Sequence, residues 1–211
     1  MKIDSHKLKT QIIDKLLLEL EKKSWAVIQN VISESEALEL IEDIHKCISM
    51  GLLENSQIGS GDNKILNEQI RSSQTIWINR WDDSPTLSKM YHFHKHLMSE
   101  LKLFFRLPLQ RFESQFAYYQ DGDFYKKHRD QLNKTKHRQF TSILYLNQPQ
   151  SGGELVIYSK ENKNVIEATI TPTPGKLVVF ISKDIFHEVL PCQANRYSLT
   201  TWYRDDFLIP F

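Results

Sequence analysis

Four residues in the C-terminal half of the chain have the types and spacing of a metal site beside an anion site. His128 and Asp130 form an H-x-D pair, and His187 follows 59 positions after His128. Arg196 lies nine positions after His187. Two histidines and one carboxylate on one face of a metal leave three coordination positions open, as in non-heme Fe(II) oxygenases. The pattern predicts that His128, Asp130 and His187 bind Fe(II).

Arg196 has the chemistry to bind the carboxylate of a co-substrate. A guanidinium is a planar fork that can donate two hydrogen bonds to one carboxylate. Burying this charge costs several kcal/mol unless an anion pairs with it. A 2-oxo acid would chelate the metal and present its distal carboxylate to Arg196. The four residues are therefore the predicted catalytic group of a dioxygenase that uses Fe(II), dioxygen and 2-oxoglutarate.

Strands are the elements expected to position these side chains. Residues i and i+2 of a strand point to the same face, so His128 and Asp130 could present two ligands together. His187 would come from another strand. Residues 188–195 are expected to form a strand, a turn and a second strand, which would place Arg196 on a strand next to that of His187.

The N-terminal half of the chain is predicted to be largely helical. Ser33 and Glu36 form a capping box before a second helix, and Ser84 with Pro85 marks the start of a third. The residues with helical spacing are Leu8, Ile12, Leu16, Leu17 and Leu20, then Leu38, Leu40, Ile41 and Ile44, then Leu87, Met90, Tyr91, His94, Leu97, Leu101 and Phe104.

Beyond residue 70, apart from the third helix, short runs rich in β-branched and aromatic residues predict strands. These runs are residues 70–81, 112–120, 140–147, 153–159, 165–171, 176–182 and 197–204. The expected fold is mainly β with N-terminal helices (α+β), a double-stranded β-helix or jelly roll buttressed by helices. One domain is expected over residues 1–211, with a helical part at 5–50 and 84–105 and a jelly-roll core at 110–204.

Charge and composition limit the classes of partner. The formal net charge is +1, so no global field would attract nucleic acid and no nucleic-acid partner is expected. The two cysteines, Cys47 and Cys192, indicate neither a disulfide framework nor a zinc site. The sequence shows no apolar signal core at its start and no run long enough to span a membrane. A cytoplasmic protein without a membrane partner is expected.

Other polar residues fit simpler roles. His92 and His96 have the spacing of a ligand pair on a helix, but no glutamate completes an H-E-x-x-H motif, so an exposed helix face is the preferred interpretation. Cys192 is interpreted as a small core or hairpin residue. The basic run of residues 126–139 is either a solvated hairpin or a positive rim at the pocket mouth. The polar residues 54–73 predict a long loop that is functional or disordered.

Several segments resemble the prolyl hydroxylase branch of the 2-oxoglutarate oxygenases, especially the oxygen-sensing prolyl hydroxylases and their bacterial relatives. Tyr119–Asp130 matches Y-x-x-G-x-F-Y-x-x-H-x-D, and His187–Tyr203 matches H-E-V-x-P followed by R-Y-x-x-T-x-W-Y. The GGEL turn at Gly152–Leu155 and the run RQFTSILYLN at Arg138–Asn147 are also similar. The likeness covers most of the chain, from about Trp25 to Arg204.

The resemblance implies a role for each matching residue. His128, Asp130 and His187 match the iron ligands, and Arg196 and Tyr145 match the residues that bind the distal carboxylate of 2-oxoglutarate. Tyr119, Thr200 and Trp202 match the walls of the co-substrate pocket. Arg138, Arg71 and Trp202 are the implied substrate-binding residues, and residues 54–73 match a mobile loop that closes over a bound peptide.

The chain departs from the family at the end of that loop. The family often has I-R-G-D-x-x-x-W, whereas this chain has IRSSQTIW. Arg71 and Trp77 are in place, but Ser72 and Ser73 replace Gly and Asp, so an Arg–Asp pair cannot form there. The two serines change how the loop can close and therefore which substrate it can accept. They leave the iron chemistry unchanged.

The activity implied by the resemblance is hydroxylation of prolyl residues in a protein to 4-hydroxyproline, with release of succinate and CO2. It also implies ascorbate as an accessory reductant and a monomer or weak dimer. A hydroxylase of a free amino acid or small metabolite is the alternative. A non-catalytic binding protein is disfavoured because it needs no buried cationic fork. A nucleic-acid demethylase is disfavoured because Trp202 stands where that class has a second arginine.

Overall fold

The computed structural model describes residues 5–56, 69–132 and 135–207. In chain order the described elements are α1 (Ser5–Lys23), β1 (Trp25–Ile28), α2 (Glu34–Ser49), β2 (Glu54–Asn55), β3 (Gln74–Trp77), α3 (Pro85–Phe105), β4 (Arg111–Tyr119), β5 (Tyr125–His128), β6 (Arg138–Tyr145), β7 (Ser151–Gly152), β8 (Leu155–Tyr158), β9 (Ile166–Ile170), β10 (Leu177–Ile181), β11 (His187–Val189), β12 (Cys192–Gln193) and β13 (Arg196–Arg204).

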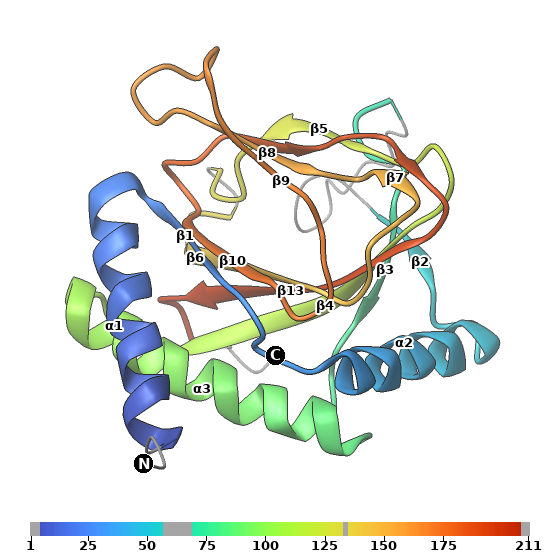
Figure 1. Ribbon diagram of the computed structural model, residues 1–211, viewed down its shortest axis with the longest axis horizontal. Helices are drawn as coiled ribbons and strands as arrows, with labels where there is room; N and C mark the ends of the chain where they lie inside the picture. Colours follow the sequence, from blue (N-terminus) through green and yellow to red (C-terminus); the bar gives the residue numbers. More distant parts are fainter. Residues whose placement is uncertain (1–4, 57–68, 133–134, 208–211) are drawn as a thin grey trace.

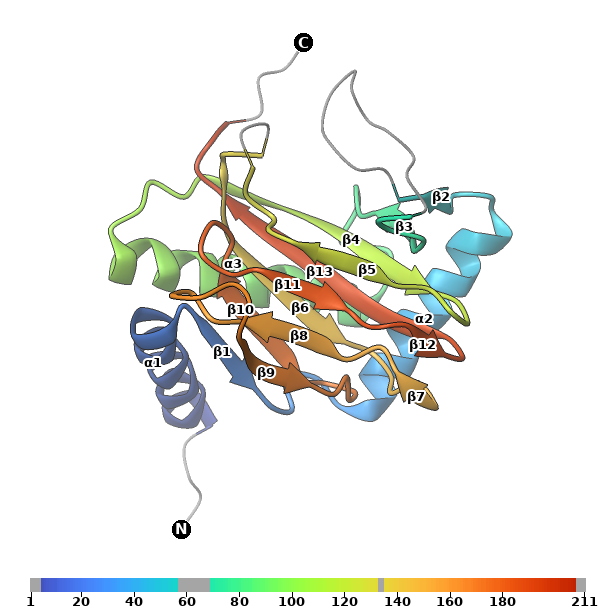
Figure 2. The same cartoon turned by 90° about the horizontal axis from the view of Figure 1, so that it is seen from above.

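The elements form three layers. A large antiparallel sheet has the strand order β1-β10-β6-β13-β4-β3-β2, and a small one has the order β5-β11-β8-β9. Figure 1 shows the small sheet on top, the large sheet in the middle, α2 and α3 below the large sheet, and α1 along its left edge beside β1. Figure 2, turned by 90°, shows the small sheet lying across the large one. The predicted mainly β fold with helices on one sheet is confirmed in this arrangement.

Eight strands of the two sheets pair in a nested order. β4 pairs with β13, β5 with β11, β6 with β10, and β8 with β9, all antiparallel. The first strand of the set thus pairs with the last, the second with the one before it, and so on inward. This wrapping brings β5 and β11 side by side in the small sheet, over β4 and β13 in the large one.

The helices begin where the sequence predicts. Ser33 accepts a hydrogen bond from the backbone N–H of Glu36 at 3.2 Å, and the Glu36 carboxylate accepts one from the backbone N–H of Ser33 at 2.8 Å. Ser84 accepts from the backbone N–H of Leu87 at 3.2 Å, with Pro85 as the first helical residue. Both predicted caps are confirmed.

Three residues expected on apolar helix faces are instead exposed: Ile12, Leu38 and Phe104. In α1 the buried stripe is Ile13, Leu16, Leu17 and Leu20, which is the i, i+3, i+4, i+7 spacing of one helix face. Ile12 lies one position outside that stripe. Leu38 likewise lies beside a stripe that runs through Ala37, Leu40 and Ile44, and Phe104 lies in the last turn of α3. The Leu8 side chain is outside the described residues.

β1 was not expected from the sequence, and the strand within residues 70–81 is shorter than predicted. β1 adds to the edge of the large sheet, where Trp25 pairs with Phe180 and Ile28 with Leu177. Of residues 70–81 only β3 is a strand, and it pairs with β4 and β2. Most of the predicted loop, residues 57–68, lies outside the described residues.

Two apolar cores stabilise the layers. The larger one lies between the helices and the large sheet and includes Leu20, Leu97 and Leu199. The second includes Ile143 of the large sheet and Leu155 and Ile157 of the small one. Within the described residues, no helix has the length and apolar character needed to cross a membrane. The second core surrounds the predicted site residues Tyr119 and Tyr145.

Candidate metal centre and co-substrate pocket

The three predicted metal ligands lie together at the mouth of the space between the sheets. His187 of β11 stands directly opposite His128 of β5. Asp130 Oδ1 lies 3.4 Å from Nε2 of His128 and 3.8 Å from Nε2 of His187. Donor atoms bonded at about 2.1 Å to one ion lie roughly 3–4 Å apart. The set therefore fits one metal ion.

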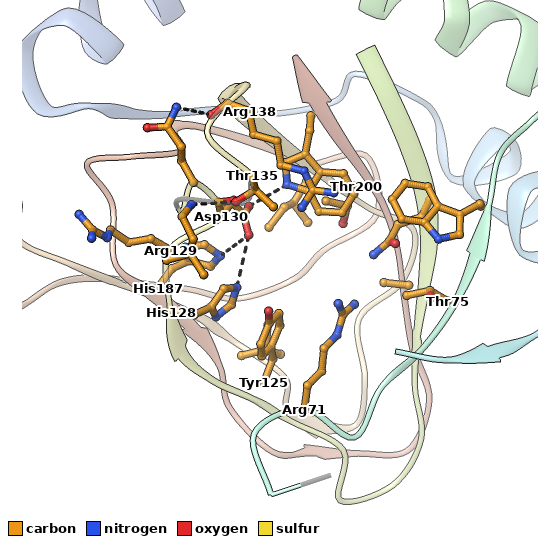
Figure 3. A pocket seen from close by; sticks show the side chains of 18 of the residues that line it. Arg71, Thr75, Tyr125, His128, Arg129, Asp130, Thr135, Arg138, His187 and Thr200 are labelled. Atoms are coloured by element: carbon orange, nitrogen blue, oxygen red, sulfur yellow. Dashed lines mark hydrogen bonds and ion pairs between the residues drawn. The ribbon is translucent and has the colours of Figure 1, made fainter. Parts of the chain in front are cut away.

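Asp130 does not share a strand with His128, contrary to the sequence prediction. β5 ends at His128, and Asp130 lies in the bend that follows. The carboxylate still turns toward the two imidazoles, as the dashed lines in Figure 3 show. The two side chains do point to the same place, as predicted. It is the bend after β5, and not a continuous strand, that turns Asp130 toward His128.

The backbone fixes which nitrogen of each histidine faces the metal site. Nδ1 of His128 lies 2.8 Å from the carbonyl oxygen of Lys126, and Nδ1 of His187 lies 3.3 Å from that of Ile185. A carbonyl only accepts hydrogen bonds, so Nδ1 carries the proton and Nε2 keeps its lone pair for a metal. Burial lowers the pKa of His187 to about 4, so this imidazole is neutral at pH 7.

The second oxygen of Asp130 is held by two donors from the large sheet. Oδ2 accepts from the hydroxyl of Thr141 at 2.7 Å and from the indole N–H of Trp202 at 3.0 Å. Burial alone would raise the pKa of Asp130, but the neighbouring histidines hold it well below its usual range. Oδ1 is thus left for a metal. The resemblance implied only that Trp202 lines the co-substrate pocket, and the structure adds this hydrogen bond to Asp130.

β13 presents alternate residues to the space between the sheets. Arg196, Ser198, Thr200 and Trp202 are spaced by two and so share one face of the strand. Arg196 pairs across the sheet with Tyr119. The sequence analysis placed Arg196 on a strand adjacent to that of His187; instead β13 lies in the large sheet, facing β11 across the interior.

Arg196 is a buried cation whose charge is not matched by a carboxylate. Only 1% of the residue is exposed, and its Nε donates to the Gly153 carbonyl at 2.9 Å. Nη1 donates to the Ser198 hydroxyl at 3.3 Å. The guanidinium carbon lies 4.7 Å from the Tyr119 ring centroid and 5.1 Å from that of Tyr145. Among the described residues no acid lies within ion-pair distance of Arg196.

Tyr145 adds a free donor beside this cation. Its hydroxyl is buried and has no hydrogen-bond partner among the described side chains and backbone. Burial raises the pKa of Tyr145 to about 12, so the hydroxyl keeps its proton and can donate. A buried guanidinium and a buried hydroxyl without an acceptor together require an anion. The residues present therefore fit the distal carboxylate of a 2-oxo acid.

A cavity of about 640 Å³ opens beside the triad. Its wall includes the three predicted metal ligands together with Tyr119, Thr200 and Trp202 (Figure 3). Arg196 and Tyr145 are not in the wall, but the Arg196 guanidinium carbon lies 4.7 Å from the ring centroid of Tyr119, which is in the wall. The Tyr119 ring thus contacts both the cavity and the buried cation.

The predicted substrate-binding residues Arg71 and Arg138 both line the cavity. Arg138 lies over the Trp202 ring, 3.8 Å from its centroid. Its Nε donates to Glu113 at 2.9 Å, and its Nη2 lies 2.8 Å from the same carboxylate in an ion pair. Arg71 donates to the Ser73 hydroxyl at 2.8 Å and lies over the Tyr125 ring. Ser73, one of the two serines that depart from the family pattern, therefore holds Arg71 through a neutral hydrogen bond.

The structure also tests the interpretations of three other polar features. His92 and His96 are exposed on α3, which agrees with the interpretation as an exposed helix face. Cys192 is buried and its thiol donates to the Gln120 carbonyl at 3.1 Å, which agrees with a small core residue. Arg129 and Lys136 line the cavity, so of the two interpretations of the basic run the positive rim agrees with the structure.

Sequence reasoning missed two residues that shape the site. Tyr125 stacks on His128 with ring centroids 3.5 Å apart, although the F-Y pair of the matched motif could have pointed to it. Gly153 has a positive φ of 69°, and a Cβ there would lie 2.9 Å from Cδ of Arg196. The GGEL turn was noticed, but a sequence does not show that its second glycine accommodates the arginine.

Comparison with known proteins agrees with this geometry. Residues 114–204 match the model of the 2OG-Fe(II) oxygenase superfamily. That span begins in β4, ends with β13 and contains all three predicted metal ligands and Arg196. The C-terminal part of this chain is therefore similar to the 2OG-Fe(II) oxygenase superfamily.

Two solved prolyl hydroxylase structures are similar to this chain along nearly its whole length. A prolyl-4-hydroxylase from Pseudomonas putida is 27% identical, with a TM-score of 0.79, over 92% of this chain and 100% of that one. A prolyl hydroxylase from Trichoplax adhaerens, solved with a hypoxia inducible factor peptide fragment, has a TM-score of 0.80 at 24% identity over 97% and 94% of the two chains. The second likeness concerns the fold alone.

A curated relative gives a match in sequence. A hypoxia-inducible factor prolyl hydroxylase from Caenorhabditis elegans is 26% identical over 92% of this chain. The match covers 28% of that protein, so the chain spans little more than a quarter of the length of this relative.

Proposed function

We propose that this protein is an Fe(II)- and 2-oxoglutarate-dependent dioxygenase that hydroxylates prolyl residues of a protein substrate to 4-hydroxyproline, releasing succinate and CO2. The observation that carries the proposal is the buried Arg196, without an acid partner in the described chain, in the same interior as the His128, Asp130 and His187 cluster. The similarity to the Pseudomonas putida prolyl-4-hydroxylase supports the choice of substrate.

Fe(II) and 2-oxoglutarate, when bound, would supply oxidative decarboxylation coupled to oxygen insertion into a C–H bond. His128, Asp130 and His187 would hold the metal through Nε2, Oδ1 and Nε2. Arg196 would bind the distal carboxylate of the co-substrate through its guanidinium, and the Tyr145 hydroxyl would donate a hydrogen bond to the same group.

The neighbouring side chains would orient these groups. Thr141 and Trp202 direct the Asp130 carboxylate by holding Oδ2. Tyr119 and Thr200 would line the co-substrate path, and Arg71 and Arg138 would flank the substrate at the mouth. The apolar side chains of Ile143 and Val189 also line the cavity and would help to exclude water from the reacting centre.

We extend the proposal to architecture and setting. The nested pairing of eight strands supports a double-stranded β-helix at residues 110–204 within a single domain over residues 1–211. We further propose ascorbate as an accessory reductant, a monomer or weak dimer, and a cytoplasmic location, on the resemblance and the composition described above.

Mass spectrometry of a cognate proteome would test the activity. Extracts treated with the wild-type protein, Fe(II) and 2-oxoglutarate are compared with extracts treated with Asp130→Ala. We expect a gain of one oxygen on specific prolines only with the wild type. Modification of a free amino acid or metabolite without any modified proline would replace the protein substrate by the small-molecule alternative.

A further inference from the structure

The cavity wall carries an excess of positive charge. Its described lining contains the cations Arg71, Arg129, Lys136, Arg138 and Lys183, and the carboxylates Glu54 and Asp130. Asp130 is a predicted metal ligand, so a bound metal ion would use its charge. The whole chain has a formal net charge of only +1. The positive charge is therefore concentrated at this opening.

Four of these five cations have no carboxylate partner in the described parts of the chain. Arg138 is the exception, because it forms an ion pair with Glu113 at 2.8 Å and donates a hydrogen bond to it at 2.9 Å. Among the described residues, the Arg71 side chain donates to the neutral hydroxyl of Ser73 and lies over the Tyr125 ring. Lys136 and Lys183 are exposed and form no ion pair with a described residue.

Arg129 and Lys183 are brought together on one side of the opening. Nη1 of Arg129 donates to the Lys183 carbonyl at 3.0 Å, and its guanidinium carbon lies 4.7 Å from the Phe186 ring centroid. Nε of Arg129 is buried and has no hydrogen-bond partner among the described atoms. Figure 3 shows Arg71 on the opposite side of His128 from Arg129. Like charges held near one another repel, so the cluster is most favourable with an anion bound.

We propose that the segment of substrate bound in this cavity is acidic, with Asp or Glu carboxylates on both sides of the reacting residue. The inference rests on the proposed function for the identity of the reacting residue. Carboxylates on one side of that residue bind near Arg129, Lys136 and Lys183, and those on the other side bind near Arg71. The cations lie at the mouth, whereas Arg196 in the interior is reserved for the co-substrate.

A polypeptide fits this opening better than a nucleic acid. The uncompensated cations border one cavity instead of following a long groove, and nucleic-acid sites usually carry an extended basic surface. Glu54 also lines the wall and would repel a continuous phosphate backbone. A peptide can place its few carboxylates next to the cations and keep them away from Glu54.

Peptide binding measured by fluorescence anisotropy tests the inference separately from catalysis. The probes are short labelled peptides with one central proline, flanked either by Asp and Glu or by Asn and Gln. They bind to protein loaded with 2-oxoglutarate and Mn(II) in place of Fe(II). The variant is Lys136→Gln with Lys183→Gln. The control is Lys95→Gln with Lys102→Gln, two exposed lysines of α3 outside the cavity lining.

We expect the wild type to bind the acidic peptide about tenfold more tightly than the amide peptide. The cavity variant should lose about two- to thirtyfold in affinity for the acidic peptide, since it removes two exposed ion pairs that contribute about 0.2–1 kcal/mol each. The control variant, with the same change in net charge, should keep the wild-type preference. Raising the salt concentration should weaken acidic-peptide binding in the wild type.

Equal binding of the two peptides to the wild type would overturn the inference, whether or not either peptide is hydroxylated. Equal losses in the cavity and control variants would overturn it as well. Charge-dependent binding, without any hydroxylated proline when Fe(II) and dioxygen replace Mn(II), would support the acidic partner and reject prolyl hydroxylation. An oligonucleotide that displaced the acidic peptide at equal charge concentration would assign the opening to nucleic acid instead.

Discussion

The indole N–H of Trp202 donates a hydrogen bond of 3.0 Å to Oδ2 of Asp130, 72 positions earlier in the chain. Trp202 pairs across the large sheet with Thr141, whose hydroxyl donates to the same oxygen. Side chains of paired residues lie on the same face of a sheet. One cross-strand pair thus fixes the orientation of the only anionic ligand in the predicted metal site.

Trp202→Phe is expected to weaken metal binding while keeping most of the apolar wall. Loss of a partner that orients a metal ligand typically costs 10- to 100-fold in metal affinity or activity, so we expect about a tenfold weaker affinity. Titration with Mn(II) or Co(II) measures it. Trp77→Phe is the matched control, because Trp77 also lines the cavity but makes no hydrogen bond to Asp130. Equal affinity in Trp202→Phe and wild type would show that the indole donor does not position the carboxylate.

Arg196→Ala is expected to weaken 2-oxoglutarate binding and to leave metal affinity largely intact. Removing one partner of a buried charge pair costs about 2–5 kcal/mol, which corresponds to roughly thirty-fold or more in affinity. Tyr145→Phe should act in the same direction with a smaller effect, because it removes one hydrogen bond to a charged acceptor. Calorimetric titration of 2-oxoglutarate into metal-loaded protein compares the three. Unchanged affinity in Arg196→Ala would mean that another cation binds the carboxylate.

Gly153→Ala is expected to disturb Arg196. The added Cβ would lie 2.9 Å from Cδ of Arg196 and 3.1 Å from Cβ of Cys192, and the backbone has a positive φ of 69°. We expect lower 2-oxoglutarate affinity together with a loss of about 1–2 kcal/mol of stability. Gly122→Ala is the control, since its φ is 83° but a Cβ there meets nothing within 4 Å. It should lose comparable stability and keep full co-substrate affinity; an equal loss of affinity in both variants would remove Gly153 from the site.

His94 should make the protein less stable in acid. Burial lowers the pKa of His94 to about 3, whereas an unfolded histidine has a pKa of about 6.5. The unfolded state therefore binds a proton that the folded state does not. The stability is fully present above pH 6.5 and falls as the pH decreases toward 3, by up to about 1.4 kcal/mol per pH unit.

Urea unfolding of His94→Gln between pH 4 and pH 6 measures how much this proton contributes to the pH dependence of the free energy of unfolding. The variant should show a slope of stability against pH that is smaller by about one proton than that of the wild type. His92→Gln changes an exposed histidine of the same helix and should keep the wild-type slope. Identical slopes for His94→Gln and wild type would contradict the role of His94.

The clustering of His128, Asp130 and His187 was predictable because its signal is local or chemical. The H-x-D pair requires only that two residues close in sequence, His128 and Asp130, point to the same side. His187 is recognisable by its residue type and by Arg196, nine positions later. The helix caps at Ser33 and Ser84 were predictable for the same reason, since each cap is completed within three residues.

The remaining features depend on strand pairing across long stretches of sequence. The contact of Trp202 with Asp130 requires the register that places Trp202 opposite Thr141. The position of Arg196 depends on β13 crossing to the large sheet, which periodicity does not reveal. β1 is only four residues long and gains its stability from pairing with β10. Strand register and the assignment of each strand to a sheet depend on the topology of the whole fold and not on the local sequence pattern.

Labelling with ¹⁸O₂ tests the central claim most directly, because it does not require knowledge of the substrate. The protein is incubated with Fe(II), 2-oxoglutarate and ¹⁸O₂, and the succinate is analysed by mass spectrometry. We predict that wild-type protein releases succinate with one labelled oxygen and that Asp130→Ala releases none above the level without protein. Unlabelled succinate, or equal labelled succinate from wild type and Asp130→Ala, would contradict an Fe(II) and 2-oxoglutarate dioxygenase built on this triad.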